Sequence, residues 1–157
     1  MDWLKELFSN PYLLTGVSSW LIAQVLKTIL HLIIYKKLNF ERLFGDGGMP
    51  SGHSATVSSL ATICGLSFGL ASVEFAITAI LAIIVCHDAT GVRRETGKHA
   101  QVLNELLHSL ETGKPIDLKE LIGHPDLKEL VGHTPLQVLA GILIGVGNAF
   151  LMYYVIL

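Results

Sequence analysis

The stretch GGMPSGHSATVSSLATICGLSFGLA, residues 47–71, joins a glycine-rich loop to a run of small and apolar residues. Pro50 followed by Ser51 is typical of a helix start, with the Ser51 side chain as the N-cap. The N–H groups of a first helical turn and the positive end of the helix dipole attract anions. Since His53 lies in the same turn, the stretch predicts an anion site with a proton donor, although a capped helix with a solvated histidine has the same pattern.

The second half of this stretch, residues 54–71, is rich in Ala, Ser, Thr and Gly, and it carries Gly65 and Gly69 four positions apart. Small residues allow helices to approach closely, so we expect a central helix of a bundle. Gly141 and Gly145 repeat this spacing near the C-terminus. Such small-residue faces can also join two copies of the chain into a homo-oligomer.

On either side of this helix the chain is mostly apolar. Hydrophobic residues make up 51% of the 157 residues and charged residues only 15%, with a mean hydropathy of +0.55. These values suit a membrane protein, because a helix of about 20 apolar residues spans the hydrocarbon core. We therefore predict an all-α polytopic membrane helix bundle, a single domain over residues 1–157. Its four spans cover about residues 12–35, 54–71, 75–92 and 136–157.

A polar loop over residues 95–134 interrupts these spans. Apolar residues at helical spacing predict an amphipathic helix over residues 98–110. The near-repeat DLKELIGHP, residues 117–125, and DLKELVGHTP, residues 126–135, predicts two short helical turns on the same face. The net charge of −2 and the lack of a basic tail give no indication of nucleic-acid binding.

Ionisable residues within the predicted spans are candidates for function. Gln24, Lys27 and His31 share one face of the first span, and Asp88 lies in the last turns of the third. We expect Lys27 to face the bundle interior, although its long stem could instead carry the ammonium group to the lipid headgroups. Arg93 follows the third span, where an arginine also complements the helix dipole.

Topology brings the polar candidates together. Four spans place both termini on one side, so the other side receives residues 47–53, Arg93, Arg94 and His133. Arginines and helix N-termini are common phosphate ligands, and a second histidine can attack a bound phosphate. Nine of the eleven Lys and Arg residues lie on this face or its loops. The positive-inside rule therefore predicts that the face is cytoplasmic, as in a bacterial plasma membrane.

These residues resemble the motifs of the type 2 phosphatidic acid phosphatase superfamily, which includes acid phosphatases and vanadium-dependent haloperoxidases. The superfamily pattern begins with a lysine, six residues and Arg-Pro. It continues with Pro-Ser-Gly-His and ends with Ser-Arg, five residues, His, three residues and Asp. Pro50-Ser51-Gly52-His53 matches the middle motif in full. Lys27 resembles the first lysine, Arg93 or Arg94 the arginine, and His133 the last histidine. The chain is most similar to the divergent bacterial and plant branch.

The chain also departs from this pattern. No Arg-Pro follows Lys27 at the expected distance, and Arg42 is the nearest candidate. Gln137 stands where the superfamily has the aspartate that orients the nucleophilic histidine, and Asp88 could replace that carboxylate. His99 has the superfamily spacing from Arg93, but we prefer His133, because it precedes an apolar span as the superfamily histidine does.

The resemblance implies that His133 attacks a phosphomonoester or diphosphate and that His53 protonates the leaving group, with no metal or other cofactor. Residues implied to hold the phosphate are Lys27, Arg42, Ser51, Gly52, Arg93 and Arg94. A site within the membrane implies a lipid phosphate, such as a phosphatidate or a polyprenyl diphosphate. The alternatives are a non-catalytic protein that binds anionic lipid headgroups and, third, a haloperoxidase that binds vanadate in place of phosphate.

Overall fold

The computed structural model describes residues 2–36, 48–90, 102–104, 106–110, 112 and 133–156. Within these ranges the chain is helical and has no strand, which confirms the all-α fold class. Residues 102–104 and 106–110 are helical, in agreement with the predicted amphipathic helix. The other helices are α1 (Asp2–Phe8), α2 (Pro11–Tyr35), α3 (Gly52–Phe68), α4 (Val73–Thr90) and α7 (Pro135–Ile156).

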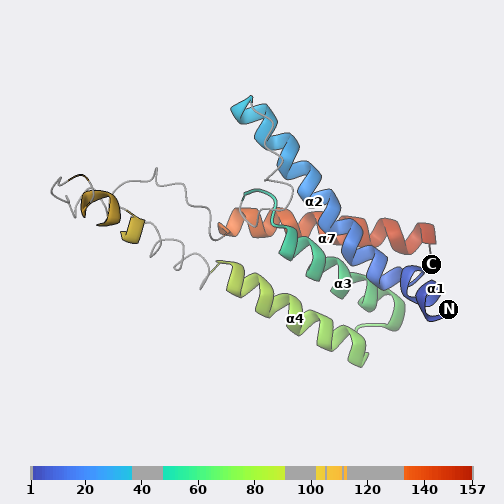
Figure 1. Ribbon diagram of the computed structural model, residues 1–157. Helices are drawn as coiled ribbons and strands as arrows, with labels where there is room; N and C mark the ends of the chain where they lie inside the picture. The colour runs from blue at the N-terminus through green and yellow to red at the C-terminus, as the bar shows by residue number, and fades with distance from the viewer. Residues whose placement is uncertain are drawn as a thin grey trace.

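The four long helices run alternately in opposite directions, and both chain termini lie at the same end of the bundle (Figure 1). Helix α3 contacts α2, α4 and α7. It is therefore the central helix that its small residues predicted. The ends of α2 and α4 and the starts of α3 and α7 lie toward the opposite end from the termini, as the four-span topology requires.

Three of these helices, α2, α4 and α7, are long and apolar enough to cross a membrane. Helix α3 has 17 residues, so at 1.5 Å per residue it is about 26 Å long, slightly less than the hydrocarbon core. Its position explains its composition, because neighbouring helices rather than lipid surround it. Ser54 and Ser59 of α3 are completely buried.

Local capping defines the helix ends. Asn10 Oδ1 accepts hydrogen bonds from the N–H groups of Tyr12 and Leu13 at 3.0 and 3.1 Å and begins α2. Gly69 ends α3 with a φ of 86°, a conformation that favours glycine. Gly69 therefore acts as a cap and not as the packing residue that its spacing from Gly65 predicted. Gly65 does lie in a close contact, because a Cβ there would be 3.0 Å from the Phe75 ring.

Helices α3 and α7 pack closely through glycines. A Cβ on Gly141 would collide with the Ser51 carbonyl oxygen, and one on Gly145 would collide with Ala55 and Ser58. The predicted close packing at Gly141 and Gly145 is confirmed, and it occurs within one chain. Since both glycines are buried against α3, this face is not available to a second copy of the chain. The homo-oligomer stays a prediction without support from this face.

A buried asparagine joins α7 to α2. Asn148 Nδ2 donates hydrogen bonds to the Ser18 and Ser19 hydroxyl oxygens at 2.9 and 2.8 Å. It also lies 3.3 Å from the Thr15 carbonyl oxygen. Hydrogen bonds between helices stabilise membrane bundles, where water cannot replace them. Together with the glycine contacts, this network fixes α2 and α7 on two sides of α3.

Candidate active site

Ser51 places the start of α3 against α7. Its side chain is fully buried, and its Oγ accepts hydrogen bonds from the Ser54 N–H at 3.3 Å and the Ser54 hydroxyl at 3.0 Å. The predicted N-cap is therefore confirmed. The Ser51 N–H donates to the Gln137 carbonyl oxygen at 3.0 Å, so main-chain atoms connect the two helix starts.

A second main-chain hydrogen bond connects α7 to the end of α4. The His133 N–H donates to the Ala89 carbonyl oxygen at 3.0 Å. The His133 side chain is only 3% exposed. The end of α4 and the starts of α3 and α7 are thus joined to each other by backbone atoms, independently of the side chains that they carry.

This junction brings two histidines together. The ring centroids of His53 and His133 are 6.3 Å apart, with 58° between the ring planes. His53 is half-buried and His133 is buried. At this separation one phosphate group can contact both rings, so the predicted convergence of the two histidines is confirmed. Their catalytic roles stay predictions.

Gln137 contacts the ring of His133. Gln137 Oε1 accepts a hydrogen bond from the Thr134 N–H at 3.0 Å, and the Gln137 N–H donates to Thr134 Oγ1 at 3.4 Å, which is a capping box. The N–H donor shows which amide atom faces Thr134, because only Oε1 can accept. His133 Nδ1 lies 3.3 Å from the same Oε1, so a His133 tautomer that carries its hydrogen on Nδ1 can donate to this oxygen.

Lys27 lies inside the bundle. Its side chain is only 4% exposed, so the alternative that it reaches the lipid headgroups is wrong. A Cβ on Gly48 would be 3.4 Å from Lys27 Cγ and 3.5 Å from Cδ. The lysine therefore extends along the loop that precedes the Ser51 cap, as expected for a ligand of an anion bound there.

Two further α2 residues lie beside this loop. Gln24 is 4% exposed, and its Oε1 has no hydrogen-bond partner within the described residues. A Cβ on Gly52 would be 3.9 Å from Gln24 Cδ and 3.2 Å from the Trp20 ring. The sequence predicts Gln24 on the face of Lys27 but not among the site residues, and it indicates no role for Trp20. His31, the third residue of that face, instead lies against Tyr35, with 4.6 Å between the ring centroids.

Of the four remaining site candidates, the structure describes only Asp88. Asp88 is half-buried in the last turn of α4, next in sequence to Ala89, and its role as a substitute carboxylate stays a prediction. Arg42, Arg93 and Arg94 lie outside the described residues. Within the described part of the chain, no group of three or more His, Cys, Asp or Glu residues could hold a metal ion.

Comparison with known proteins agrees with this geometry. A family model described as the divergent PAP2 family matches residues 8–148. The chain belongs to the divergent PAP2 family. The membrane protein YuiD of Bacillus subtilis (strain 168), described as uncharacterized, is 40% identical over 133 residues, 76% of this chain and 84% of YuiD. No solved structure matches the chain.

Membership of the divergent PAP2 family confirms the resemblance that the motifs indicated, since PAP2 denotes the type 2 phosphatidic acid phosphatases. The matched region contains Lys27, His53 and His133. Together with the three apolar helices and the membrane-protein relative, the match identifies an integral membrane protein of a phosphatase-like family.

Proposed function

We propose that this protein is a membrane-embedded phosphohydrolase that removes phosphate from a lipid phosphate or polyprenyl diphosphate without a metal ion. The observation that carries the proposal is the pair of histidine rings 6.3 Å apart. His133 Nδ1 lies 3.3 Å from Gln137 Oε1, a contact that favours the tautomer with the hydrogen on Nδ1 and leaves Nε2 for the attack. A nucleophile and a proton donor on either side of one phosphate are what phosphoryl transfer through histidine requires.

Phosphate binding comes first. The N-terminus of α3 presents backbone N–H groups and the positive end of a helix dipole to an anion. Lys27, buried beside the preceding loop, supplies a full positive charge where water is scarce, so its attraction for phosphate is strong. In the proposed function Arg42, Arg93 and Arg94 complete the set of positive ligands.

The first chemical step transfers the phosphoryl group to His133. The Nε2 lone pair attacks phosphorus, a new N–P bond forms, and the bond from phosphorus to the leaving oxygen breaks. This is the ester oxygen of a monoester or the bridging oxygen of a diphosphate. The leaving oxygen takes a proton from the His53 imidazolium, so that a neutral alcohol, or for a diphosphate substrate the lipid monophosphate, departs. Gln137 accepts the Nδ1–H bond throughout, which keeps the nucleophilic nitrogen directed at the phosphate.

The second step releases phosphate by hydrolysis. Neutral His53 accepts a proton from a water molecule as the water oxygen attacks phosphorus, and the N–P bond to His133 breaks. Inorganic phosphate leaves, and both histidines return to their initial protonation states. One histidine thus acts first as an acid and then as a base, a sequence that microscopic reversibility allows.

The direct test is phosphate release from a panel of lipid phosphates by purified protein in phospholipid nanodiscs. We expect His53→Ala and His133→Ala each to abolish release, and the exposed His108 gives a matched control, His108→Ala. With ³²P-labelled substrate, acid-labile and base-stable label should accumulate on the wild type but not on His133→Ala. Normal turnover by His133→Ala would exclude the proposed nucleophile.

We also propose that the site faces the cytoplasm of a bacterial plasma membrane. Nine of the eleven Lys and Arg residues support this orientation through the positive-inside rule. Single cysteines in a background that lacks Cys64 and Cys86 test it with a reagent that does not cross the membrane. Asp2→Cys should label in intact cells, whereas Asp46→Cys and Lys114→Cys should label only after lysis. The reverse pattern would place the site outside.

One observation favours a second function, the binding of anionic lipid headgroups without catalysis. Gln137 is a neutral amide where the superfamily has a carboxylate, so it cannot stabilise an imidazolium by charge. In that case the protein would bind lipid phosphates saturably, with Lys27→Met weakening binding, and would release no phosphate from any of them. The nanodisc assay separates the two functions because binding and turnover are measured on the same samples.

A further inference from the structure

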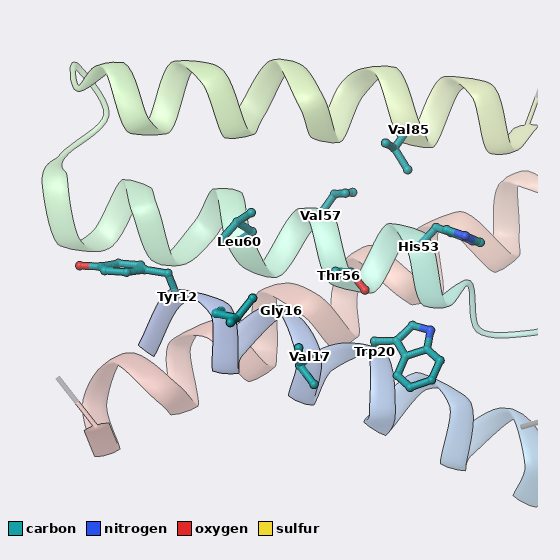
Figure 2. A pocket seen from close by; sticks show the side chains of 10 residues that line it. Tyr12, Gly16, Val17, Trp20, His53, Thr56, Val57, Leu60 and Val85 are labelled. Carbon is teal, nitrogen blue, oxygen red and sulfur yellow. The ribbon is translucent and has the colours of Figure 1, made fainter. Parts of the chain in front are cut away.

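An apolar cavity of about 450 Å³ lies between α2, α3 and α4. Gly16, Val17 and Trp20 of α2 line one wall, and Val57 of α3 and Val85 of α4 line the other (Figure 2). Almost all of its lining surface is apolar. The hydroxyl of Thr56, which also lines the cavity, already donates to the Gly52 carbonyl oxygen at 2.9 Å.

One end of this cavity is the proposed active site. His53 lines the cavity, and it lies beside Trp20 at one end of the view, whereas Tyr12 lies at the other end (Figure 2). The Tyr12 ring stacks on Phe68 with 5.2 Å between the ring centroids. Tyr12 and Trp20 are eight residues apart on α2, a length of about 12 Å along the helix axis. The cavity is therefore a groove that leads from the proposed acid to an aromatic pair.

The lining determines which kind of lipid fits. In a glycerolipid, a glycerol unit and two ester carbonyl groups separate the phosphate from the hydrocarbon chains. Placed beyond His53, those carbonyl groups would lose their water and meet apolar walls, which is costly without new hydrogen bonds. A hydrocarbon chain attached directly to the phosphate oxygen would meet apolar surface from its first carbon onward, and its burial is favourable.

We propose that this groove binds the single hydrocarbon chain of a long-chain or prenyl alcohol phosphate, and that such an ester, rather than a glycerolipid, is the substrate. The inference rests on the proposed function, since it takes His53 as the proton donor to the leaving oxygen. It extends that function by naming the substrate class. The hydrocarbon chain of the substrate lies along α2 from Trp20 to Tyr12 and leaves the groove toward the bilayer.

Gly16 offers a way to fill the groove. A Cβ at Gly16 would lie 3.7 Å from Thr56 Cγ2, which is an ordinary contact. The leucine of Gly16→Leu therefore fits, and the atoms of its side chain beyond Cβ occupy the groove. The matched control is Gly147→Leu on α7, where a Cβ would meet nothing within 4 Å. Val17→Phe is a second filling variant, and it should disturb folding less because Val17 is 47% exposed.

The first experiment compares substrates. We expect the wild type to hydrolyse farnesyl phosphate and dodecyl phosphate with a kcat/KM at least tenfold above that for dioleoyl phosphatidate. Gly16→Leu and Val17→Phe should lower the ratio of kcat/KM for farnesyl phosphate to that for para-nitrophenyl phosphate at least tenfold, and Gly147→Leu should not change it. Equal rates on phosphatidate and farnesyl phosphate, or an unchanged ratio in both filling variants, would overturn the inference while leaving the proposed function intact.

The second experiment does not need activity. The chain has two tryptophans, so Trp3→Phe leaves Trp20, in the groove wall, as the only one. In phosphatidylcholine nanodiscs, a dodecyl phosphate with bromine on its chain should quench Trp20 emission saturably, and Gly16→Leu should abolish the saturable part. Quenching that does not saturate, or that brominated phosphatidylcholine reproduces, would show that bulk lipid fills the groove and would overturn the inference. Saturable quenching without hydrolysis would support the groove and contradict the proposed function.

Discussion

Replacing Gln137 by glutamate tests how much a carboxylate behind His133 contributes to turnover. Glutamate has the same length and shape as glutamine, so the contact of 3.3 Å between His133 Nδ1 and Oε1 can be kept. Glutamate is also the other residue that a capping box uses at this position, so the hydrogen bond from the Thr134 N–H at 3.0 Å is retained. The substitution therefore adds a negative charge with little change in geometry.

The expected gain is moderate. Loss of the carboxylate from a serine–histidine–aspartate triad costs about 10⁴ in rate, but that loss also changes the histidine tautomer. Here the capping box holds the Gln137 amide so that its oxygen can still accept from Nδ1–H, and the charge contribution is what is missing. A hydrogen bond between neutral groups contributes about 0.5–1.5 kcal/mol and one with a charged group about 1.5–3 kcal/mol. The midpoints of these ranges differ by about 1.25 kcal/mol, which corresponds to a roughly eight- to tenfold higher kcat.

The assay is the steady-state release of phosphate from farnesyl phosphate in nanodiscs, with Gln137→Leu as the opposite change. Gln137→Glu should raise kcat about tenfold, and Gln137→Leu, which removes the acceptor, should lower it by a similar factor. Gln137→Asp is one methylene shorter and should fall between the wild type and the glutamate variant. If neither Glu nor Leu changes kcat while Asp88→Asn abolishes it, Asp88 supports His133 and the reasoning about Gln137 is refuted.

Three other predictions follow from the packing. Lys27→Met should lower kcat/KM for lipid phosphates about 10- to 150-fold, the loss of one charged hydrogen bond; unchanged kinetics would remove Lys27 from the site. Gln24→Leu removes a buried amide whose Oε1 lacks a hydrogen-bond partner within the described residues. The KM for lipid phosphates should therefore rise several-fold while the melting temperature stays the same. A lower melting temperature with normal KM would indicate a structural role only. Gly145→Ala should lower the free energy of unfolding by about 1–3 kcal/mol through overpacking, as measured by unfolding in mild detergent, and Gly147→Ala should not; equal stabilities would contradict the close α3–α7 contact.

The amino-acid sequence predicted the helices well because their signals are strong. Long apolar runs leave few alternatives, and the ends of the four long helices agree with the predicted spans to within three residues. The Pro50-Ser51-Gly52-His53 motif and the alternating topology were sufficient to predict that His53 and His133 lie together. The helix ends and the meeting of the two histidines both depend on the order of the elements along the chain, which a single sequence shows.

Other features depended on contacts that the sequence does not show. The Thr134–Gln137 capping box has the sequence Thr-x-x-Gln, but the same glutamine also stands where the superfamily pattern has an aspartate, and the pattern alone does not show which contact it makes. Gly65 and Gly69 have the spacing of a packing motif, yet Gly69 has a positive φ and ends the helix. Neither the role of Trp20 beside Gly52 nor the apolar groove could be predicted, because both arise where residues from different helices meet.

The burial of α3 has a consequence for how the protein enters the membrane. A segment of 17 residues that contains several serines and threonines partitions weakly into lipid on its own, because each hydroxyl must leave water before its final neighbours are in place. Helix α4 is strongly apolar, and only residues 69–72 separate it from α3. The two helices should therefore leave the translocon as one hairpin, in which α4 supplies the driving force for insertion. A released chain truncated after residue 70 should leave α3 accessible to a water-soluble probe, and one that extends past α4 should protect it.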